Sequence, residues 1–354
     1  MNVASRVHFD LHGVRVAAIY LVCLQHVAHM LPRVVDGLSP GFPDRLRTSL
    51  TITGLGAFLI LSGMTLSITY QPVRSAQELF QFYRKRCVPH VVTFLTLNLL
   101  AFLAAWIVPD LCWNPDSKNR LSMIILDPRA TPATVLWYLL FIAEMALAWP
   151  LIDKLLPSQN HKLALLAASY LVKYLCLKGL IAVPTWLGLY IGVMVAPYFL
   201  WGAALGLARR ERVPPLFAIA FITWCLCAFF LHRLAPNFLT AELMALSGTY
   251  ALIYGVGLAG GMSQKIRRIF GPLAAGTWDV YLLHTPYVVI PVILLIGRLH
   301  LTVTQSLIIL PIAAALVVAL SFGLGRIIRA IPYGSHYILG VSQRRSEPSS
   351  YQQA

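Results

Sequence analysis

Long apolar stretches recur along the whole chain and leave few charged residues between them. A helix of about 20 apolar residues can cross a bilayer, because a helix satisfies its own backbone hydrogen bonds in lipid. Hydrophobic residues make up 58% of the chain and charged residues 12%, which excludes a soluble enzyme, a secreted disulfide scaffold and a disordered chain. We expect an all-α polytopic membrane protein whose helices enclose a central cavity, with about ten spans near 13–31, 49–70, 88–108, 133–152, 162–178, 186–207, 214–234, 240–261, 272–296 and 302–327.

Most Lys and Arg residues outside these spans fall in the N-terminus, in every second loop and in the tail. Since positive charges collect in cytoplasmic segments, both termini are predicted to be cytoplasmic. The net charge of +15 then reports topology and needs no nucleic-acid partner. The six cysteines lack metal-ligand spacing, so we expect no metal site. The predicted organisation is one transmembrane domain over 1–335 and a disordered polar tail over 336–354.

The first span carries two ionisable residues, Arg15 and His26. Eleven residues at 100° each bring both side chains to one helix face, about 16 Å apart along the axis. A cation near the cytoplasm can hold an anionic donor, and an imidazole can take a proton from a hydroxyl near neutral pH. A snorkelling arginine and an unrelated core histidine explain the pair about equally well. His29 shares the face and either orients His26 or lies at the interface.

Two later spans also contain ionisable groups, which are costly in lipid and therefore indicate function. Glu144 either orients His26, binds an acceptor, carries protons or pairs with an arginine. Asp279, Tyr281 and His284 share the ninth span, where Pro286 is expected to kink the helix beside a cavity.

A basic cluster, Arg84, Lys85 and Arg86, precedes the third span at its predicted cytoplasmic end. Clustered cations recognise phosphates. They also determine topology and contact lipid headgroups, which for this cluster alone is the simpler explanation.

Taken in chain order, these segments resemble acyltransferase family 3, the bacterial membrane O-acyltransferases that modify surface glycans. His12 stands where the family usually has Asp, and the basic motif before Pro89 is shifted. The resemblance rests on Leu11-His12-Gly13-Val14-Arg15 with His26, on Phe58-Leu59-Ile60-Leu61-Ser62-Gly63, on Trp137-Tyr138-Leu139 with Glu144, and on Tyr281-Leu282-Leu283-His284-Thr285-Pro286.

The resemblance implies a multi-pass O-acetyltransferase of the bacterial inner membrane. Acyl-coenzyme A, commonly acetyl-coenzyme A, would be the cytoplasmic donor. A hydroxyl of a surface polysaccharide such as lipopolysaccharide, or of its lipid-linked sugar precursor, would be the acceptor. The expected site residues are His26 as general base with Arg15, Glu144 and His284 as further catalytic groups, Arg84, Lys85 and Arg86 for the donor, and Ser62, Tyr281 and His29 for the substrate.

The competing interpretation is a proton-coupled secondary transporter that uses Glu144, Asp279 and His284, or a glycan exporter. Transporters often contain two related halves, whereas the polar motifs here all differ from one another. Acyl transfer from coenzyme A releases a free thiol and transport does not, so thiol release separates the two interpretations.

Overall fold

The computed structural model describes residues 3–35, 37–38, 41–107, 121–205, 214–228, 238–259 and 271–340. Within these ranges the regular structure is helical and there is no β-strand. Seven helical segments are long and apolar enough to cross a membrane, which confirms an all-α, multi-pass architecture. They cover Gly13–Arg33, Ala76–Ile107, Thr134–Leu155, Trp186–Ala204, Phe238–Val256, Thr277–Gly297 and Val303–Ala330.

Three further helices coincide with the other predicted spans. Helix α2 (Gly41–Thr69) contains a shorter apolar segment, Thr53–Thr69, and α7 (Gln159–Leu177) and α9 (Pro214–Leu226) are not among the seven. The count of ten therefore stays a prediction, as does the side on which each terminus lies. The basic residues of 206–213 and 260–270, and the tail over 341–354, lie outside the described residues.

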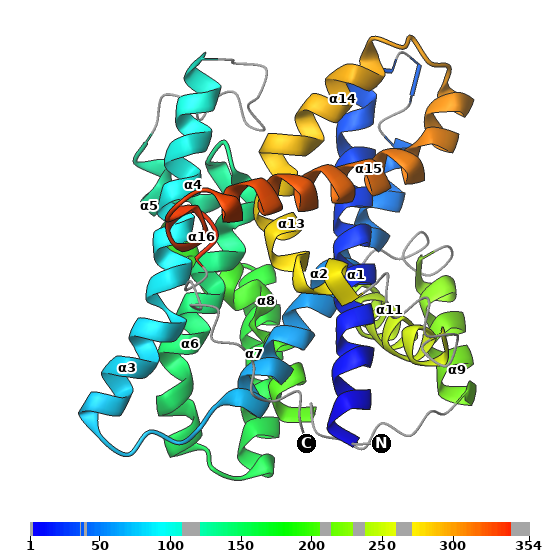
Figure 1. Cartoon of the computed structure of the whole chain (residues 1–354). Helices are drawn as coiled ribbons and strands as arrows, with labels where there is room; N and C mark the ends of the chain where they lie inside the picture. The colour runs from blue at the N-terminus through cyan, green and yellow to red at the C-terminus, as the bar shows by residue number, and fades with distance from the viewer. Residues whose placement is uncertain are drawn as a thin grey trace.

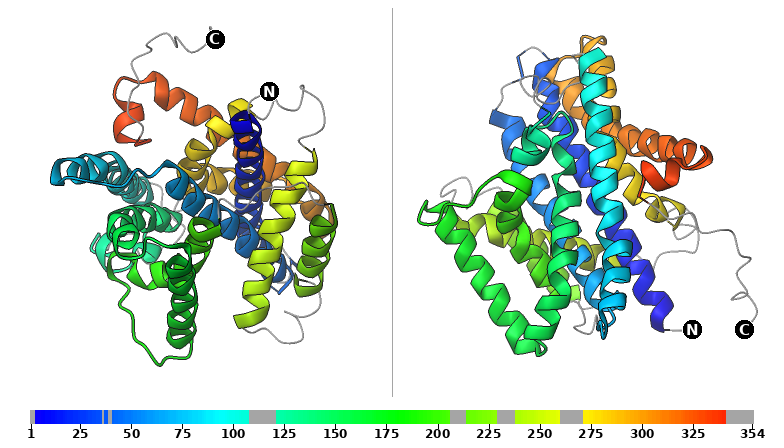
Figure 2. Two further views of the ribbon diagram at one scale, coloured as in Figure 1. Left: turned by 90° about the horizontal axis from the view of Figure 1, so that it is seen from below. Right: turned by 90° about the vertical axis from the view of Figure 1, so that its left-hand side faces the viewer.

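Helix α1 (Val3–Met30) runs through the middle of the molecule and packs along α2 (Figure 1). Helix α8 (Leu189–Leu205) packs on α2, and α11 (Phe238–Ala259) joins α9 to both α1 and α2. Helix α3 (Ala76–Arg86) runs on almost in line into α4 (Val88–Ile107), which packs on α6 (Trp137–Leu155) (Figure 2). Short helical turns are η1 (Leu31–Arg33), α5 (Met123–Leu126), η4 (Pro128–Ala130), η5 (Thr134–Leu136), η6 (Trp186–Gly188) and α16 (Gly334–Tyr337).

Glycines allow α2 and α8 to cross at close range. A Cβ atom on Gly63 would lie 1.9 Å from the carbonyl oxygen of Phe199. A Cβ atom on Gly202 would lie 1.9 Å from the carbonyl oxygen of Ile60. Each glycine therefore faces the backbone of the other helix, as small residues do where membrane helices touch.

The ninth predicted span is interrupted, as the position of Pro286 predicted. Helix α13 (Thr277–Leu283) passes through a wide turn, η8 (His284–Val288), into α14 (Val289–Gly297). Thr285 is extended, with φ −139° and ψ 138°, because the ring of a following proline disfavours the helical conformation. Since Pro286 also lacks an N–H, the carbonyl groups of the preceding turn are open to other donors.

Helix α15 (Val303–Ala330) is steeply inclined to α1 and α4 in the view of Figure 1. Its 28 residues span about 42 Å, more than the ~30 Å of a bilayer core. A long apolar helix can fit such a core by tilting. Exposed Ile308, Ile312 and Leu316 recur every four residues along α15, which suits a face in contact with lipid.

A buried ion pair explains the lysine that interrupts the fifth predicted span. The Nζ of Lys173 on α7 donates to Oε1 of Glu242 on α11, and it lies 3.2 Å from the hydroxyl of Tyr198 on α8. Lys173 and Glu242 are both 7% exposed. A lysine inside a membrane span requires an opposite charge, and Glu242 supplies it from a helix that is far away in the sequence.

Candidate functional site

A cavity of about 230 Å³ lies among α1, α2, α6, α8 and α13. The guanidinium groups of Arg15 and Arg86 and the imidazole of His90 line it, and its described lining contains no carboxylate. Cationic groups in a partly desolvated cleft favour an anionic ligand. Hydroxyl groups of Ser62 and Tyr138 supply much of the remaining polar lining.

Arg15 is oriented in this cavity by a neutral partner. Its Nη2 donates to Oγ1 of Thr65 on α2 over 2.7 Å, and that hydroxyl donates to the carbonyl of Leu61 over 2.7 Å. Among the described residues, Arg15 has no carboxylate partner. The hydrogen bond therefore fixes the guanidinium and leaves its charge available.

Ser62 links α2 to α6 beside Arg15. Its hydroxyl donates to the carbonyl of Phe58 over 2.8 Å and lies 2.5 Å from the hydroxyl of Tyr138. A serine hydroxyl has one proton, so Tyr138 is the donor of the second bond. The Ser62-Gly63 pair thus directs its hydroxyl at the cavity and its glycine at α8.

Two histidines from distant parts of the chain lie side by side beyond the cavity. The ring centroids of His26 on α1 and His284 at the end of α13 are 5.1 Å apart. Tyr281 connects them to the cavity, because its ring lies 5.9 Å from that of His284 and 5.0 Å from that of Tyr138. The structure thus brings together three of the predicted site residues, His26, Tyr281 and His284.

The break in the helix determines which nitrogen of His284 carries the proton. The Nδ1 of His284 lies 2.6 Å from the carbonyl oxygen of Tyr281 and 3.1 Å from that of Val280, so Nδ1 is the donor. The Nε2 atom therefore keeps its lone pair, and among the described residues it has no hydrogen-bond partner. His284 is completely buried, whereas His26 keeps part of its surface accessible.

Glu144 lies on another side of α6 from the cavity. Tyr138, Ile142 and Ala146 line the cavity at four-residue spacing, and Glu144 is not among the lining residues. Its carboxylate faces α8, where a Cβ atom on Gly192 would lie 3.2 Å from Oε2. His29 is one turn beyond His26 on α1 and is half-buried. The structure therefore places neither residue in the lining of the cavity.

A second, more open cavity of about 710 Å³ lies at the junction of α2 and α3. Its lining includes Arg74, Lys85 and Arg86, together with Glu78. Arg86 lines both cavities and donates from Nη2 to Oγ1 of Thr69 over 3.0 Å. The two spaces therefore meet at one guanidinium group.

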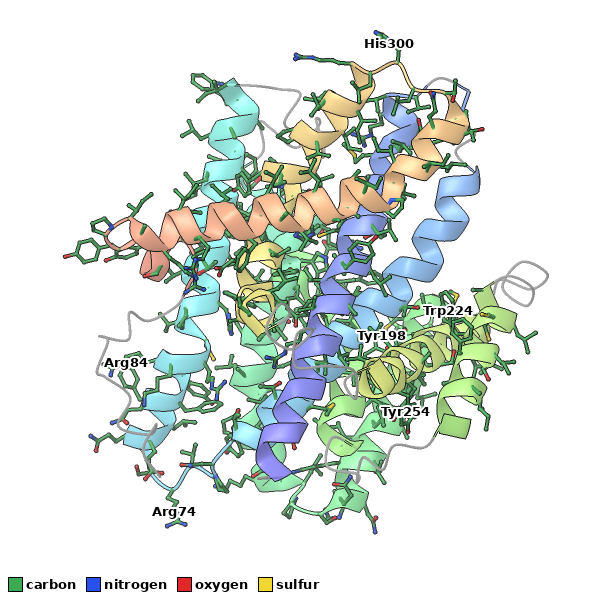
Figure 3. The ribbon with its side chains drawn as sticks, turned by 45° about the vertical axis from the view of Figure 1, so that its right-hand side comes forward. Arg74, Arg84, Tyr198, Trp224, Tyr254 and His300 are labelled. Atoms are coloured by element: carbon green, nitrogen blue, oxygen red, sulfur yellow. The ribbon has the colours of Figure 1, made fainter. Side chains whose placement is uncertain are left out.

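The sequence grouped Arg84 with this site and overlooked Arg74. Arg84 lines neither cavity, and Figure 3 shows Arg74 and Arg84 at one end of the molecule, with His300 at the opposite end. The structural basis is the α3 helix, which Ser75 caps by accepting from the N–H of Glu78. Successive residues of this helix are 100° apart, so Arg84, Lys85 and Arg86 cannot share one face.

Asp279 is held in an ion pair that the sequence did not reveal. Arg329 on α15 donates to it twice, from Nε over 2.7 Å and from Nη2 over 2.6 Å. Gly325 makes room, since a Cβ atom there would lie 2.5 Å from Cβ of Asp279. The sequence showed only that Arg329 lies at the end of an apolar stretch, and a role in membrane topology explains an arginine there equally well.

The fold and the site define a class, the multi-pass membrane proteins that combine a cation-lined cavity with a pair of imidazoles in contact. Residues 8–326 match the family model described as an acyltransferase domain, so the chain belongs to acyltransferase family 3. Searches among curated proteins and among solved structures found no match.

Proposed function

We propose that the protein is a transmembrane O-acyltransferase that moves an acyl group from acyl-coenzyme A, acetyl-coenzyme A foremost, to a hydroxyl of a surface glycan or its lipid-linked precursor. The single observation that carries the proposal is the contact between His26 and His284 beyond the lining of a cation-lined cavity in a member of this family. The proposed location is the bacterial inner membrane, with the donor arriving from the cytoplasm.

The donor would extend through both cavities. Its phosphates suit the larger cavity, here called the outer cavity, where Arg74, Lys85 and Arg86 gather. The rest of the donor would extend past Arg86 into the smaller cavity, here called the inner cavity. Arg15 would hold an anionic or carbonyl oxygen of the donor inside the inner cavity, since it lies about 16 Å along α1 from His26 and so cannot reach the carbonyl that the acceptor attacks. Arg84 is a weaker candidate for donor contact, because it lines neither space.

The reaction would use the histidine pair as base and support. The acceptor oxygen forms a bond to the thioester carbon, the carbon–sulfur bond breaks, and the coenzyme A thiolate leaves. His26 takes the hydroxyl proton, since it is the member of the pair with accessible surface, and later returns it to the thiolate. His284 is the positioning residue, because its ring packs 5.1 Å from that of His26 while its Nδ1 is fixed to the backbone and its Nε2 keeps a lone pair. Glu144 has no role in this mechanism, because it lies on another side of α6 from the cavity.

The test uses inverted membrane vesicles from cells that make the acceptor glycan, supplied with labelled acetyl-coenzyme A. We expect thiol release and a glycan mass that rises by one acetyl group. His26→Ala, checked for folding by a monodisperse detergent extract, should lower both by about 100-fold or more. A folded His26→Ala protein with unchanged glycan acetylation would refute the proposal. Transport without thiol release would favour the transporter interpretation instead.

A further inference from the structure

Three aromatic rings, here called the partition, pack together in the lining of the inner cavity, and one of them, Tyr281, also packs against His284. The ring centroids of Phe58 and Tyr138 are 6.5 Å apart, those of Phe58 and Tyr281 are 6.3 Å apart, and those of the two tyrosines are 5.0 Å apart. All three residues line the cavity, while neither His26 nor His284 is among its lining residues. A group that passes from the cavity to the imidazoles beside Tyr281 therefore meets these rings.

Two of the three rings are fixed by hydrogen bonds. Tyr138 donates to Oγ of Ser62 over 2.5 Å, and Tyr281 donates to the carbonyl oxygen of Val135 over 2.5 Å. Both tyrosines are buried, at 4% and 6% exposure. To move either ring would break the hydrogen bond of a buried hydroxyl group, which is costly.

Phe58 is the one ring of the three that no side-chain hydrogen bond can hold in place. A phenyl group has no hydroxyl to bond, and Phe58 is only half-buried, so its side chain can change rotamer more easily than either tyrosine. Its backbone is nevertheless held, because the carbonyl of Phe58 accepts from Ser62 over 2.8 Å. The partition thus combines one movable ring with two fixed ones.

We propose that Phe58 determines which acyl groups reach the histidine pair, so that it limits the chain length of the donor. A short acyl group passes when the phenyl ring swings, whereas a longer chain stays in contact with the ring and with the two fixed tyrosines. This inference rests on the proposed acyl transfer and adds a residue that selects the substrate. In this role Phe58 contacts the acyl group and takes part in no bond change.

The experiment measures transfer from acetyl-, butyryl- and hexanoyl-coenzyme A in inverted vesicles that contain the acceptor glycan. We expect the parent protein to favour acetyl over hexanoyl by at least about 10-fold, since a few methylene groups in a tight pocket give discrimination of this order. Phe58→Ala should raise the hexanoyl-to-acetyl ratio by about 10-fold or more, and Phe58→Leu, which keeps more of the apolar volume and guards against misfolding, should raise it less.

Leu66→Ala is the matched control. Leu66 also lies on α2 and lines the same cavity, two turns from Phe58 and away from the partition, so its truncation should leave the hexanoyl-to-acetyl ratio unchanged. If folded Phe58→Ala and Phe58→Leu proteins transfer acetyl groups with the parent ratio, or if Leu66→Ala changes the ratio as much, the inference is wrong. If the parent uses no acyl-coenzyme A, the proposed function fails and this inference falls with it.

Discussion

Substitutions in the ion pair between Asp279 and Arg329 test whether these two charges stabilise the fold or take part in the reaction. Asp279 lies on the helix that carries Tyr281 and His284, and its carboxylate is 1% exposed, whereas the Arg329 side chain is 32% exposed. Arg329→Ala leaves a buried carboxylate without a counter-charge. Asp279→Asn leaves instead a partly exposed cation in the last turn of α15. We therefore expect the two variants to differ strongly in stability although they break the same pair.

The magnitudes follow from that asymmetry. Removing one partner of a buried pair costs about 3–5 kcal/mol. Arg329→Ala should therefore lower the free energy of unfolding by about 3–5 kcal/mol, because it leaves the Asp279 carboxylate buried and unpaired. Asp279→Asn should lose about 1 kcal/mol, since the amide oxygen still accepts one guanidinium N–H.

The assay is thermal unfolding in detergent micelles, followed by tryptophan fluorescence. The double variant, Asp279→Asn with Arg329→Ala, should be more stable than Arg329→Ala alone, because it removes the unpaired charge. A double variant that is no more stable than Arg329→Ala, or an Asp279→Asn protein that loses as much stability as Arg329→Ala, would refute the reasoning. A folded Asp279→Asn protein that loses all acyl transfer would show that this carboxylate has a chemical role.

Gly63→Ala should destabilise the protein by about 1–3 kcal/mol or prevent its folding, because the backbones of α2 and α8 would have to separate by about 1.5 Å. In the same unfolding assay, Gly323→Ala on α15 is its control, since a Cβ atom there would meet nothing within 4 Å, and equal losses in the two variants would contradict the packing argument. Arg86→Ala should raise the KM for acetyl-coenzyme A about 10-fold or more, because a charge-assisted hydrogen bond to phosphate is lost. Arg84→Ala should raise it less, and titration of donor concentration in inverted vesicles would show the opposite order if the cavity assignment were wrong.

The first helix could be interpreted from the sequence because its information is local. Arg15 and His26 lie on one continuous helix, so their spacing alone sets their relative direction, and α1 is helical from Val3 to Met30. The same holds for the break at Pro286, whose ring acts on the residue before it. The apolar composition likewise predicted a multi-pass helical protein, since bilayer thickness imposes a minimum span length.

Pairings between helices could not be read in this way. Asp279 and Arg329 are 50 residues apart, and Lys173 and Glu242 are 69 apart, so nothing in the local pattern joins them. The direction of Glu144 depended on which neighbour covers each side of α6. Its spacing from Tyr138 shows that it lies on a different face, but the sequence did not show that Tyr138 faces the cavity. The role of a helix face can be assigned only when the elements that pack against it are known.

The order of groups along the proposed donor path follows the cost of placing charge in a bilayer. Cations gather where the phosphates of the donor would remain near water, in the outer cavity around Lys85 and Arg86. Further in, Arg15 is held by the neutral hydroxyl of Thr65. Hydroxyl, aromatic and aliphatic groups make up most of the remaining lining, and the path ends at two imidazoles that can act without a permanent charge. Only the uncharged acyl end of the donor has to travel to that depth. A deeper arginine or carboxylate would demand its own counter-charge, as Lys173 and Asp279 do, and a histidine base avoids that requirement.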